Sequence, residues 1–331
     1  MAGRRRKKSG RRSYAWRYRG RIVACVFVEV IIICALVIMI GWNKGVKEWF
    51  EQFEQPVLKE VDISGINSPN AILMQARGGK ILGEINGEAQ IYPASMTKIM
   101  TVILGIENFD DLDEKITLTN EMFTGLYEQD ATQAGFQPGE EVRVIDLLYG
   151  AMLPSGAECC IALADTISGS EADFAELMNK KARKLGMENT NFCDSTGLHN
   201  PDHYSTVKDI AVLMKYCIKN DTFREIVETS RHSTGVTNIH PDGITYYSTM
   251  FKNLSDPTVT GGKILGGKTG YTSEAGHCLV SFAEIEGREY IFVSAGASGA
   301  DGNTIPHIQD AVTVYNRVGA AIEAKMNDNN K

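Results

Sequence analysis

The sequence predicts an α/β (α+β) fold in which one antiparallel sheet is built from both ends of a domain. Candidate strands lie near residues 71–84 and again between residues 264 and 295, whereas residues 120–230 are mostly helical in pattern. Strands on either side of a helical stretch bury their apolar faces by meeting in one sheet, and the helical middle then forms a second lobe. A closing helix packs on the sheet, and one transmembrane helix precedes the domain, which is expected over residues 59–325.

The first 58 residues differ in composition from the rest. Residues 1–21 hold ten of the 34 Lys and Arg residues and no acid, so 24 basic and all 41 acidic residues follow. Residues 22–40 are apolar except for Glu29, and nineteen helical residues span roughly 28 Å, close to the hydrocarbon thickness of a bilayer. We therefore expect a basic cytoplasmic tail, a transmembrane signal-anchor helix over residues 22–42, a juxtamembrane spacer over residues 43–58, and a domain outside the cell membrane.

Two other interpretations of this segment are less consistent with its residues. A cleaved signal peptide has a shorter apolar core and a small-x-small cleavage site, which residues 41–44 do not offer. A lipidation signal at Cys25 would need its apolar stretch before the cysteine, whereas here the stretch follows it. The basic block lies directly before an apolar span and the remainder is acidic, so we expect no nucleic-acid partner.

Within the domain, the first expected element is a hairpin over residues 71–84, with its turn at Gly78 and Gly79. Residues 95–107 follow Pro93 and are apolar on most sides, which is typical of a buried helix. Later helices are expected at residues 144–153, 157–167 and 172–185, with a fourth N-capped by Ser205. Strands are expected at residues 244–250, 264–272, 277–285 and 289–295, before a closing helix that carries Ile308, Val312, Tyr315 and Ile322 on one face.

The part of the chain after residue 42 holds an odd number of cysteines: Cys159, Cys160, Cys193, Cys217 and Cys278. No CxxC pair indicates a zinc site, and a disulfide between the neighbours Cys159 and Cys160 would be strained. These cysteines are therefore expected to be buried free thiols.

Three short motifs combine nucleophilic and basic side chains. Ser95 opens the buried helix with Lys98 three residues later, so the hydroxyl and the amine share one helix face. Ser155 and Gly156 lie at a helix junction, and Lys268 lies in a glycine-rich strand, where small neighbours allow a close approach. A cleft between the lobes would collect these groups, and together they are the parts of a serine acyl-transfer site whose general base is a lysine.

In this order and context the motifs resemble those of the penicillin-binding serine D-alanyl-D-alanine carboxypeptidases. Residues 139–150, 194–199 and 203–206 resemble further stretches of that family, so the resemblance covers about residues 60–300. It implies a β-lactamase/transpeptidase-like fold, peptidoglycan stem peptides ending in D-Ala-D-Ala as substrates, and β-lactam antibiotics as inhibitors. It implies no cofactor and no metal.

The resemblance also assigns roles to individual residues. Ser95 is the nucleophile that becomes acylated, and Lys98 is its general base, with a pKa depressed by burial and by the charge of Lys268. Ser155 bridges the two lysines and passes a proton to the departing D-alanine amine. The substrate-binding residues are Lys268 and Thr269, which hold the terminal carboxylate, Gly270, which lets the peptide lie against the strand, and Tyr271, whose N–H forms an oxyanion hole with that of Ser95.

One residue departs from the family's pattern. The second motif usually reads Ser-x-Asn, whereas Ala157 occupies the third place here. An asparagine amide would contact the lysine and the substrate backbone, and a methyl group cannot. The effect of this difference on rate and substrate preference stays open.

Two alternative functions remain beside the carboxypeptidase. A serine β-lactamase needs a glutamate that activates the deacylating water, and Glu176 is the candidate, although it is expected on a helix surface. A non-catalytic penicillin-binding wall protein is suggested only by Ala157. His199 and His203 are expected in a structural loop rather than at a metal, and His277 in a strand near the site rather than as a catalyst.

Overall fold

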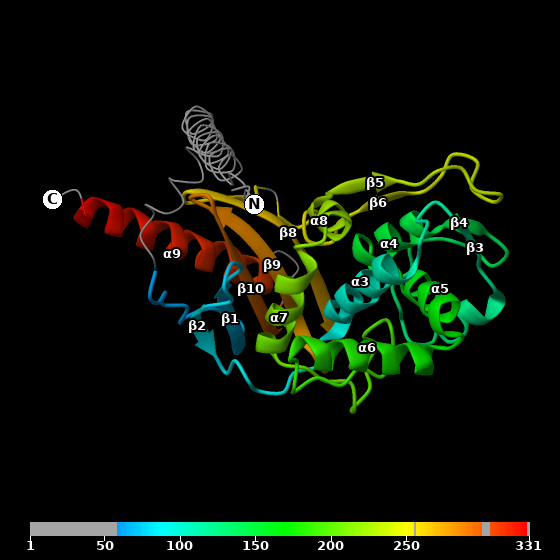
Figure 1. Ribbon diagram of the computed structural model, residues 1–331, viewed down its shortest axis with the longest axis horizontal. Helices are drawn as coiled ribbons and strands as arrows, with labels where there is room; N and C mark the ends of the chain where they lie inside the picture. The colour runs from blue at the N-terminus through cyan, green and yellow to red at the C-terminus, as the bar shows by residue number, and fades with distance from the viewer. Residues whose placement is uncertain (1–57, 255, 300–304, 330–331) are drawn as a thin grey trace, which may run out of the picture. The chain divides into compact units, whose positions relative to one another are not determined.

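The centre of the computed structural model, which describes residues 58–254, 256–299 and 305–329, is a six-stranded antiparallel sheet (Figure 1). Its strand order is β2-β1-β10-β9-β8-β7. The strands are β2 (Ile81–Ile85), β1 (Asn70–Gln75), β10 (Arg288–Ala297), β9 (Gly276–Ile285), β8 (Gly262–Thr272) and β7 (Thr258–Val259). Strands from the two ends of the domain pair between β1 and β10, which confirms the predicted fold class.

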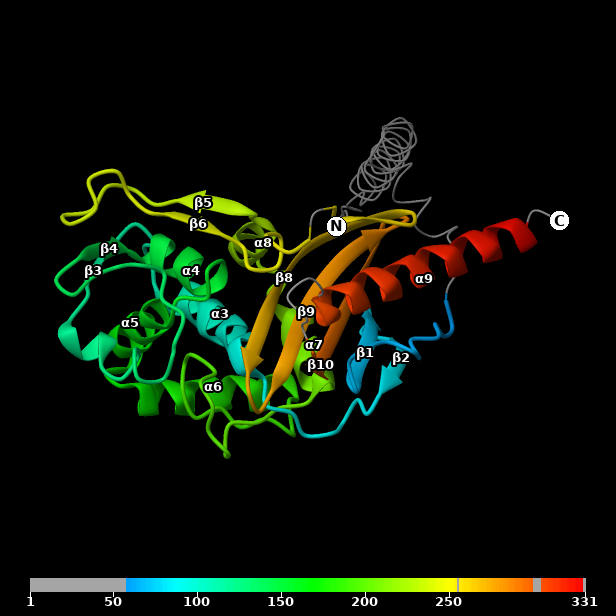
Figure 2. The same ribbon diagram turned by 180° about the vertical axis from the view of Figure 1, so that it is seen from behind.

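Each face of the sheet covers a separate apolar core. Alternate strand residues such as Leu279 and Phe292 point to one side and pack against Val314 and Val318 of α9 (Pro306–Asn329), which runs across the sheet in Figure 2. Their neighbours in the strands point the other way, toward the helices. Because successive side chains of a strand alternate between faces, both faces of these apolar strands are buried.

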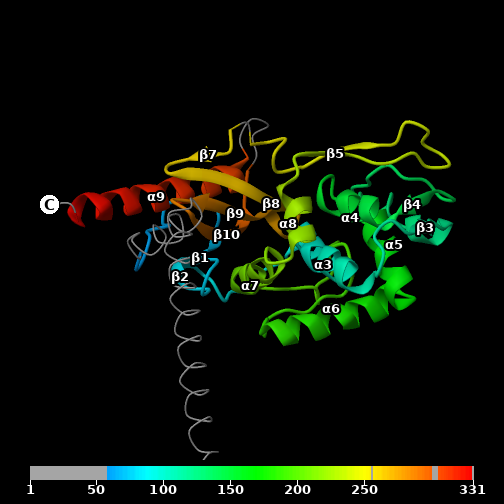
Figure 3. The same ribbon diagram turned by 45° about the horizontal axis from the view of Figure 1, so that its top comes forward.

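The helical lobe is built around α3 (Lys98–Asn108), which the short 3-10 turn η1 (Ala94–Thr97) precedes. Every α3 residue up to Gly105 is buried, as expected for a helix that is apolar on most sides. The helices in contact with it, visible in Figure 3, are α4 (Val144–Met152), α5 (Ala157–Ser168), α6 (Glu171–Leu185), α7 (Val207–Cys217) and α8 (Asp221–Glu228). Smaller elements are η2 (Asn120–Phe123) and two antiparallel two-stranded sheets, β3 (Lys115–Thr117) with β4 (Glu141–Arg143) and β5 (Arg231–Ser233) with β6 (Thr245–Tyr247).

Several local expectations need correction. The N-cap of α7 is Thr206 rather than Ser205, since the Thr206 side chain accepts a hydrogen bond from the Asp209 amide. Ser205 instead pairs through its backbone with Ile91. Cys193 is partly exposed, while the other four described cysteines are buried, and all five are free thiols.

The predicted cytoplasmic tail and transmembrane helix lie outside the described residues, as does the spacer apart from Leu58. Across the described ranges, no helix combines the length and the apolar character that crossing a membrane requires.

Candidate active site

Two residues with unusual backbone conformations flank the candidate nucleophile. Ala94, directly before Ser95, has φ 48°, and Ser155 has φ 74°. Non-glycine residues rarely adopt positive φ, and such strain persists only where the surrounding structure enforces it. Ala94 is the first residue of η1, and Ser155 lies in the connection between α4 and α5, directly before the α5 N-cap Gly156. Both strained residues are therefore at the site.

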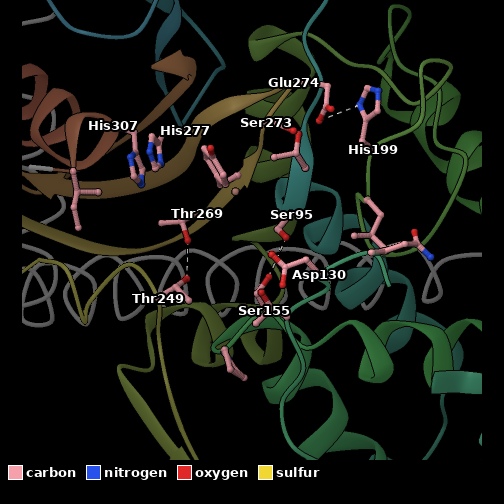
Figure 4. A pocket seen from close by; sticks show the side chains of 18 of the residues that line it. Ser95, Asp130, Ser155, His199, Thr249, Thr269, Ser273, Glu274, His277 and His307 are labelled. Atoms are coloured by element: carbon pink, nitrogen blue, oxygen red, sulfur yellow. Dashed lines mark hydrogen bonds and ion pairs between the residues drawn. The ribbon is translucent and has the colours of Figure 1, made fainter. Parts of the chain in front are cut away.

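Ser95 lies within hydrogen-bonding distance of both other members of the predicted catalytic set. The Nζ of Lys98 lies 3.0 Å from the Ser95 Oγ, and the Ser155 hydroxyl donates to the same oxygen at 3.0 Å. Figure 4 shows the two serines meeting at the bottom of a cleft. A nucleophile with a base at this distance and a second hydroxyl beside it has the geometry that proton transfer requires.

Lys98 has a second hydrogen-bond partner besides Ser95. Its ammonium or amine group also donates to the carbonyl of Thr196 at 2.6 Å, and the residue is only 3% exposed. Burial lowers the pKa of Lys98, while Cys160, Asp194 and Glu158 act in the opposite direction. Burial is the largest cause of the shift toward a neutral amine, and because repulsion between Lys98 and Lys268 is mutual, a charged Lys268 favours it as well.

Lys268, on β8, is the second buried lysine of the site. It is 1% exposed, and its Nζ donates to the carbonyl of Thr269 at 2.9 Å. Burial lowers its pKa well below the ordinary value, and the positive charge of Lys98 lowers it further. Repulsion between two buried amines allows both to be charged only at high cost, so an anion in the cleft would favour the charged form of Lys268.

A glycine allows close packing where β8 meets η1. A Cβ on Gly270 would lie 3.0 Å from the Ser95 nitrogen and 3.1 Å from the Ala94 Cβ, which is closer than side-chain atoms normally approach. The strand therefore lies directly against the turn that carries the nucleophile. Tyr271 follows with a side chain that is 62% exposed, so its part in the site is expected from its backbone rather than its ring.

The cleft in front of Ser95 has a volume of about 760 Å³. Its walls include Asp130 and Thr132 on the helical side and Thr269 and Tyr271 on β8. The Thr269 hydroxyl bonds to the hydroxyl of Thr249 at 2.7 Å (Figure 4). A volume of this size accommodates a peptide end with an adjoining side chain.

Ala157 is the first residue of α5 and is buried beside the Ser155 turn. Its backbone N–H donates to the carbonyl of Thr132 at 2.8 Å, which ties α5 to the cleft wall. The neighbouring Glu158 accepts from the amides of Ala134 and Gly135 through Oε1, while its buried Oε2 has no partner among the described residues. Burial raises the pKa of Glu158. The first turn of α5 is thus tied to residues 132–135 through the Ala157 backbone and the Glu158 side chain, and not through a side-chain amide at position 157.

A buried network that the sequence did not predict supports Lys98. Asp194 accepts from the Thr196 amide at 2.7 Å and the Gly197 amide at 2.6 Å, and its Oδ2 lies 3.0 Å from the Nδ1 of His203. The Nε2 of His203 lies 2.9 Å from the hydroxyl of Thr97. The network fixes the carbonyl that Lys98 uses and ties it to the nucleophile's turn. In the sequence, an Asp followed by Ser, Thr and Gly is typical of a tight turn and does not by itself indicate a catalytic site.

His203 therefore has the structural role expected of it. His277 lies on β9, as expected, and lines the cleft, as does His307, which the sequence analysis did not single out. No cluster of three or more His, Cys, Asp or Glu side chains suited to a metal ion occurs in the part of the chain that the structure describes.

Comparisons with known proteins agree with this geometry. A family model described as D-alanyl-D-alanine carboxypeptidase matches residues 57–299. The chain is 35% identical over 233 residues to the D-alanyl-D-alanine carboxypeptidase DacF of Bacillus subtilis, a match that covers 69% of this chain and 57% of the relative. It is 33% identical over 262 residues to DacC of Escherichia coli, covering 72% of this chain and 58% of the relative. The chain thus spans less than two thirds of the length of these two relatives.

Solved structures with similar folds belong to related enzymes. The crystal structure of a Streptomyces DD-transpeptidase matches with a TM-score of 0.69 and 29% identity, covering 79% of this chain and all of that one. A D-alanyl-D-alanine carboxypeptidase from Mycobacterium tuberculosis, at 21% identity and a TM-score of 0.69, supports the fold alone and covers 80% of this chain and 96% of that one. With the family model matching well over half of its residues, this chain belongs to the D-alanyl-D-alanine carboxypeptidase family.

Proposed function

We propose that the protein is a serine-type D-alanyl-D-alanine carboxypeptidase that removes the terminal D-alanine from peptidoglycan stem peptides. The observation that carries the proposal is the position of the Ser95 Oγ, 3.0 Å from both the Lys98 Nζ and the Ser155 Oγ at the bottom of the cleft. The same site would be acylated by β-lactam antibiotics, which makes the protein penicillin-binding.

In the acylation step, the neutral amine of Lys98 takes the proton of the Ser95 hydroxyl as the oxygen attacks the carbonyl between the two D-alanines. The backbone N–H groups of Ser95 and Tyr271 would stabilise the oxyanion of the tetrahedral intermediate. As the C–N bond breaks, Ser155 donates its proton to the departing amine and regains one from Lys98. The products are free D-alanine and an ester between Ser95 and the shortened peptide.

In the deacylation step, water attacks this ester. Lys98, neutral again, takes one proton from the water, and the proton returns to the Ser95 oxygen as the ester bond breaks. The shortened peptide leaves as a carboxylic acid. Both steps use the same base, so loss of Lys98 affects each of them.

The test combines covalent labelling with product release. A labelled penicillin is expected to bind covalently to the wild type and not to Ser95→Ala, and the wild type should release D-alanine from a pentapeptide ending in D-Ala-D-Ala. Ser273→Ala, which removes a hydroxyl from the same cleft, is the matched control and should label normally. Equal labelling of wild type and Ser95→Ala would refute the assignment of the nucleophile.

The same assays separate the alternatives. Fast release of bound penicillin would indicate a β-lactamase, but Glu176 lies exposed on α6 and does not line the cleft of Ser95, which argues against it. Labelling without D-alanine release would indicate a non-catalytic binding protein. The likeness to a Streptomyces DD-transpeptidase favours one further test, in which an added amine acceptor replaces water in the second step.

We also propose that residues 22–42 anchor the protein in the cell membrane, with residues 1–21 in the cytoplasm and the catalytic domain outside. The basic block followed by an apolar run and an acidic domain supports this orientation. Protease added to intact cells should remove the domain and spare the basic segment. A mature protein that starts after residue 42 would contradict an uncleaved anchor.

A further inference from the structure

Glu158 is a fully buried acid that the proposed acyl-transfer steps do not use. It lies in the first turn of α5, three residues after Ser155, and is 0% exposed. Its Oε1 accepts from the backbone amides of Ala134 at 2.6 Å and Gly135 at 2.9 Å, whereas its Oε2 has no partner among the described residues. A buried carboxylate oxygen without a partner is costly, so its presence next to a catalytic turn requires an explanation.

The two amides that bond to Glu158 belong to the loop that forms the helical side of the cleft. Thr132 of this loop lines the cleft, and its carbonyl accepts from the Ala157 amide at 2.8 Å. Asp130, two residues earlier, lines the cleft together with Ser155 (Figure 4). Three hydrogen bonds from residues 132–135 therefore end on the first turn of α5, two of them on one carboxylate oxygen.

The unpaired oxygen of Glu158 faces the turn that carries Ser155. A Cβ on Gly156 would lie 3.0 Å from Oε2 and 2.7 Å from the Ala134 Cβ, so the carboxylate, the loop and the turn are in close contact. Ser155 has a strained backbone, with φ 74°, and its hydroxyl donates to the Ser95 Oγ. A displacement of the Glu158 side chain would therefore reach the groups that transfer protons.

The contacts of Glu158 favour its ionised form. Both of its hydrogen bonds come from N–H donors, and Oε2 has no acceptor within reach to which a protonated carboxyl could donate. Burial raises the pKa of Glu158, and the backbone amides act against this effect. Hydrogen bonds to a charged acceptor are stronger than neutral ones, which suits a group that fixes a loop.

We propose that Glu158 is a positioning residue for acyl transfer, whose buried carboxylate holds residues 132–135 against the Ser155 turn and whose negative charge favours the ammonium that Lys98 becomes when it accepts a proton. The proposal rests on the proposed function, because Glu158 acts through the proposed base and through Ser155. It explains why a carboxylate with one unpaired oxygen is buried at this place: its charge acts on Lys98.

The charges around Lys98 oppose one another. Burial and repulsion from Lys268 favour the neutral amine, whereas the negative charges of Glu158 and Asp194 raise the pKa of Lys98. A general base must become neutral and must still bind a proton well, so groups acting in both directions are useful. The other titratable side chains that face Glu158 stay neutral because burial raises their pKa: Cys159 and Cys160 of α5 and Tyr246 of β6.

The first test uses Glu158→Gln, which keeps the length of the side chain and one acceptor oxygen but removes the charge. Acylation by a labelled penicillin is measured against pH. Loss of the negative charge lowers the pKa of Lys98, so the rise in rate should move to lower pH, by about half a unit or more for one charge at an effective dielectric constant near 20. The matched control is Glu140→Gln, a buried acid that also bonds to a loop amide, where the midpoint should not move.

The second variant, Glu158→Ala, also removes the acceptor for the two loop amides. At a pH where Lys98 is neutral, its acylation rate should fall by at least about tenfold, because a displacement of about an ångström at a positioned group can cost up to 10²-fold. Glu158→Gln should lose less at that pH. An unmoved midpoint in Glu158→Gln would overturn the proposal, and so would a wild-type rate in folded Glu158→Ala. Lower stability in urea with both quantities unchanged would mean that Glu158 only supports the fold.

A third measurement does not depend on acylation or on Glu158→Ala. The titration of Lys98 is followed by NMR in protein labelled with carbon-13 at the lysine Cε, with the signal assigned by Lys98→Ala. The pKa of Lys98 should be lower in Glu158→Gln than in the wild type, and equal values would overturn the proposal. Failure of the wild type to react with penicillin would instead count against the proposed function.

Discussion

The two walls of the cleft differ in how completely their polar groups are paired. On the helical wall, Lys98 and Ser155 each bond to the Ser95 hydroxyl, and Lys98 is further held by the carbonyl of Thr196. On the wall made by β8, β9 and α9, the Thr269 hydroxyl has one partner and the two cleft histidines have none among the described residues. Strained backbone at Ala94 and Ser155 belongs to the first wall.

This difference in pairing indicates that the two walls have different tasks, proton transfer on the helical wall and ligand recognition on the strand wall. Groups that move protons need a fixed geometry before the substrate arrives, because reorganisation during the reaction would add to the barrier. Groups that recognise a carboxylate gain their hydrogen bonds only when the ligand is present. Changes to the helical wall should therefore lower the rate of acylation, and changes to the strand wall should mainly weaken binding.

The largest effect is expected for Lys98→Ala, which removes the proposed general base. The acylation rate should fall by about 10²- to 10⁴-fold, the usual contribution of a positioned base, with little change in ligand binding. In the wild type, burial lowers the pKa of Lys98, so the neutral base should become available as pH rises through that lowered value, and acylation should rise with it. Stopped-flow acylation from pH 5 to 10 measures the loss of rate in Lys98→Ala and the pH dependence of the wild-type rate. The control is Lys180→Ala, which removes an exposed lysine. A normal rate in Lys98→Ala would require another base.

The next effect concerns the strand wall. Lys268→Arg keeps a positive charge but replaces a compact ammonium by a planar fork, which cannot occupy the same buried space. Displacement of the strand by even an ångström would lower kcat/KM by about 10²-fold. We expect a raised KM as well as a lowered kcat for a D-alanyl-D-alanine peptide. A change in kcat alone would place Lys268 with the catalytic groups instead.

A smaller effect is expected on stability. Burial would raise the pKa of Asp194, but its hydrogen bonds to His203 and Thr196 lower it to about 2. A depressed carboxyl pKa contributes stability above its unfolded value near 4, and this is lost as pH falls toward 2. Asp194→Asn should therefore lower the free energy of unfolding by about 2 kcal/mol at pH 7, and by less at pH 3.

Urea unfolding at the two pH values checks this expectation. Asp202→Asn is the matched control, since it makes the same change at an exposed position of the same loop. A pH-independent difference between wild type and Asp194→Asn would mean that the carboxylate's charge is not what the network uses.

The smallest effect is expected at Ala157. A missing neutral hydrogen bond is worth roughly 0.5–1.5 kcal/mol, and 1.4 kcal/mol corresponds to about tenfold in rate. Ala157→Asn should raise kcat/KM on a D-alanyl-D-alanine peptide by up to about tenfold, provided that the buried start of α5 admits the amide. If the variant folds normally and neither peptide turnover nor penicillin acylation changes, this position does not influence the reaction.

The motifs and the main elements could be predicted because their signals are local. Apolar periodicity places the buried helix after Pro93 and the long strands after residue 262, and motif spacing brings Ser95 and Lys98 onto one turn. What could not be predicted depends on contacts between distant segments. The helix α8 has only eight residues, too few for a clear periodic signal, and Thr206 rather than Ser205 caps α7 because Ser205 is used in a bridge to Ile91.

The supporting residues of the site were missed for the same reason. Asp194 and His203 act on Lys98 through a carbonyl nearly one hundred residues away in sequence, which no spacing rule reveals. His307 is brought to the cleft only by the packing of α9 on the sheet. A single histidine in the first turn of a helix gives no signal until the tertiary structure supplies its neighbours.

The most direct test of the difference between the walls is the dependence of the acylation rate on penicillin concentration, measured for one variant from each wall. This separates the rate of the chemical step from the dissociation constant of the initial complex. The account predicts that Ser155→Ala lowers the chemical rate with the dissociation constant unchanged, and that Thr269→Val raises the dissociation constant with the chemical rate nearly unchanged. The same pattern of change in both variants would contradict a division of labour between the two walls.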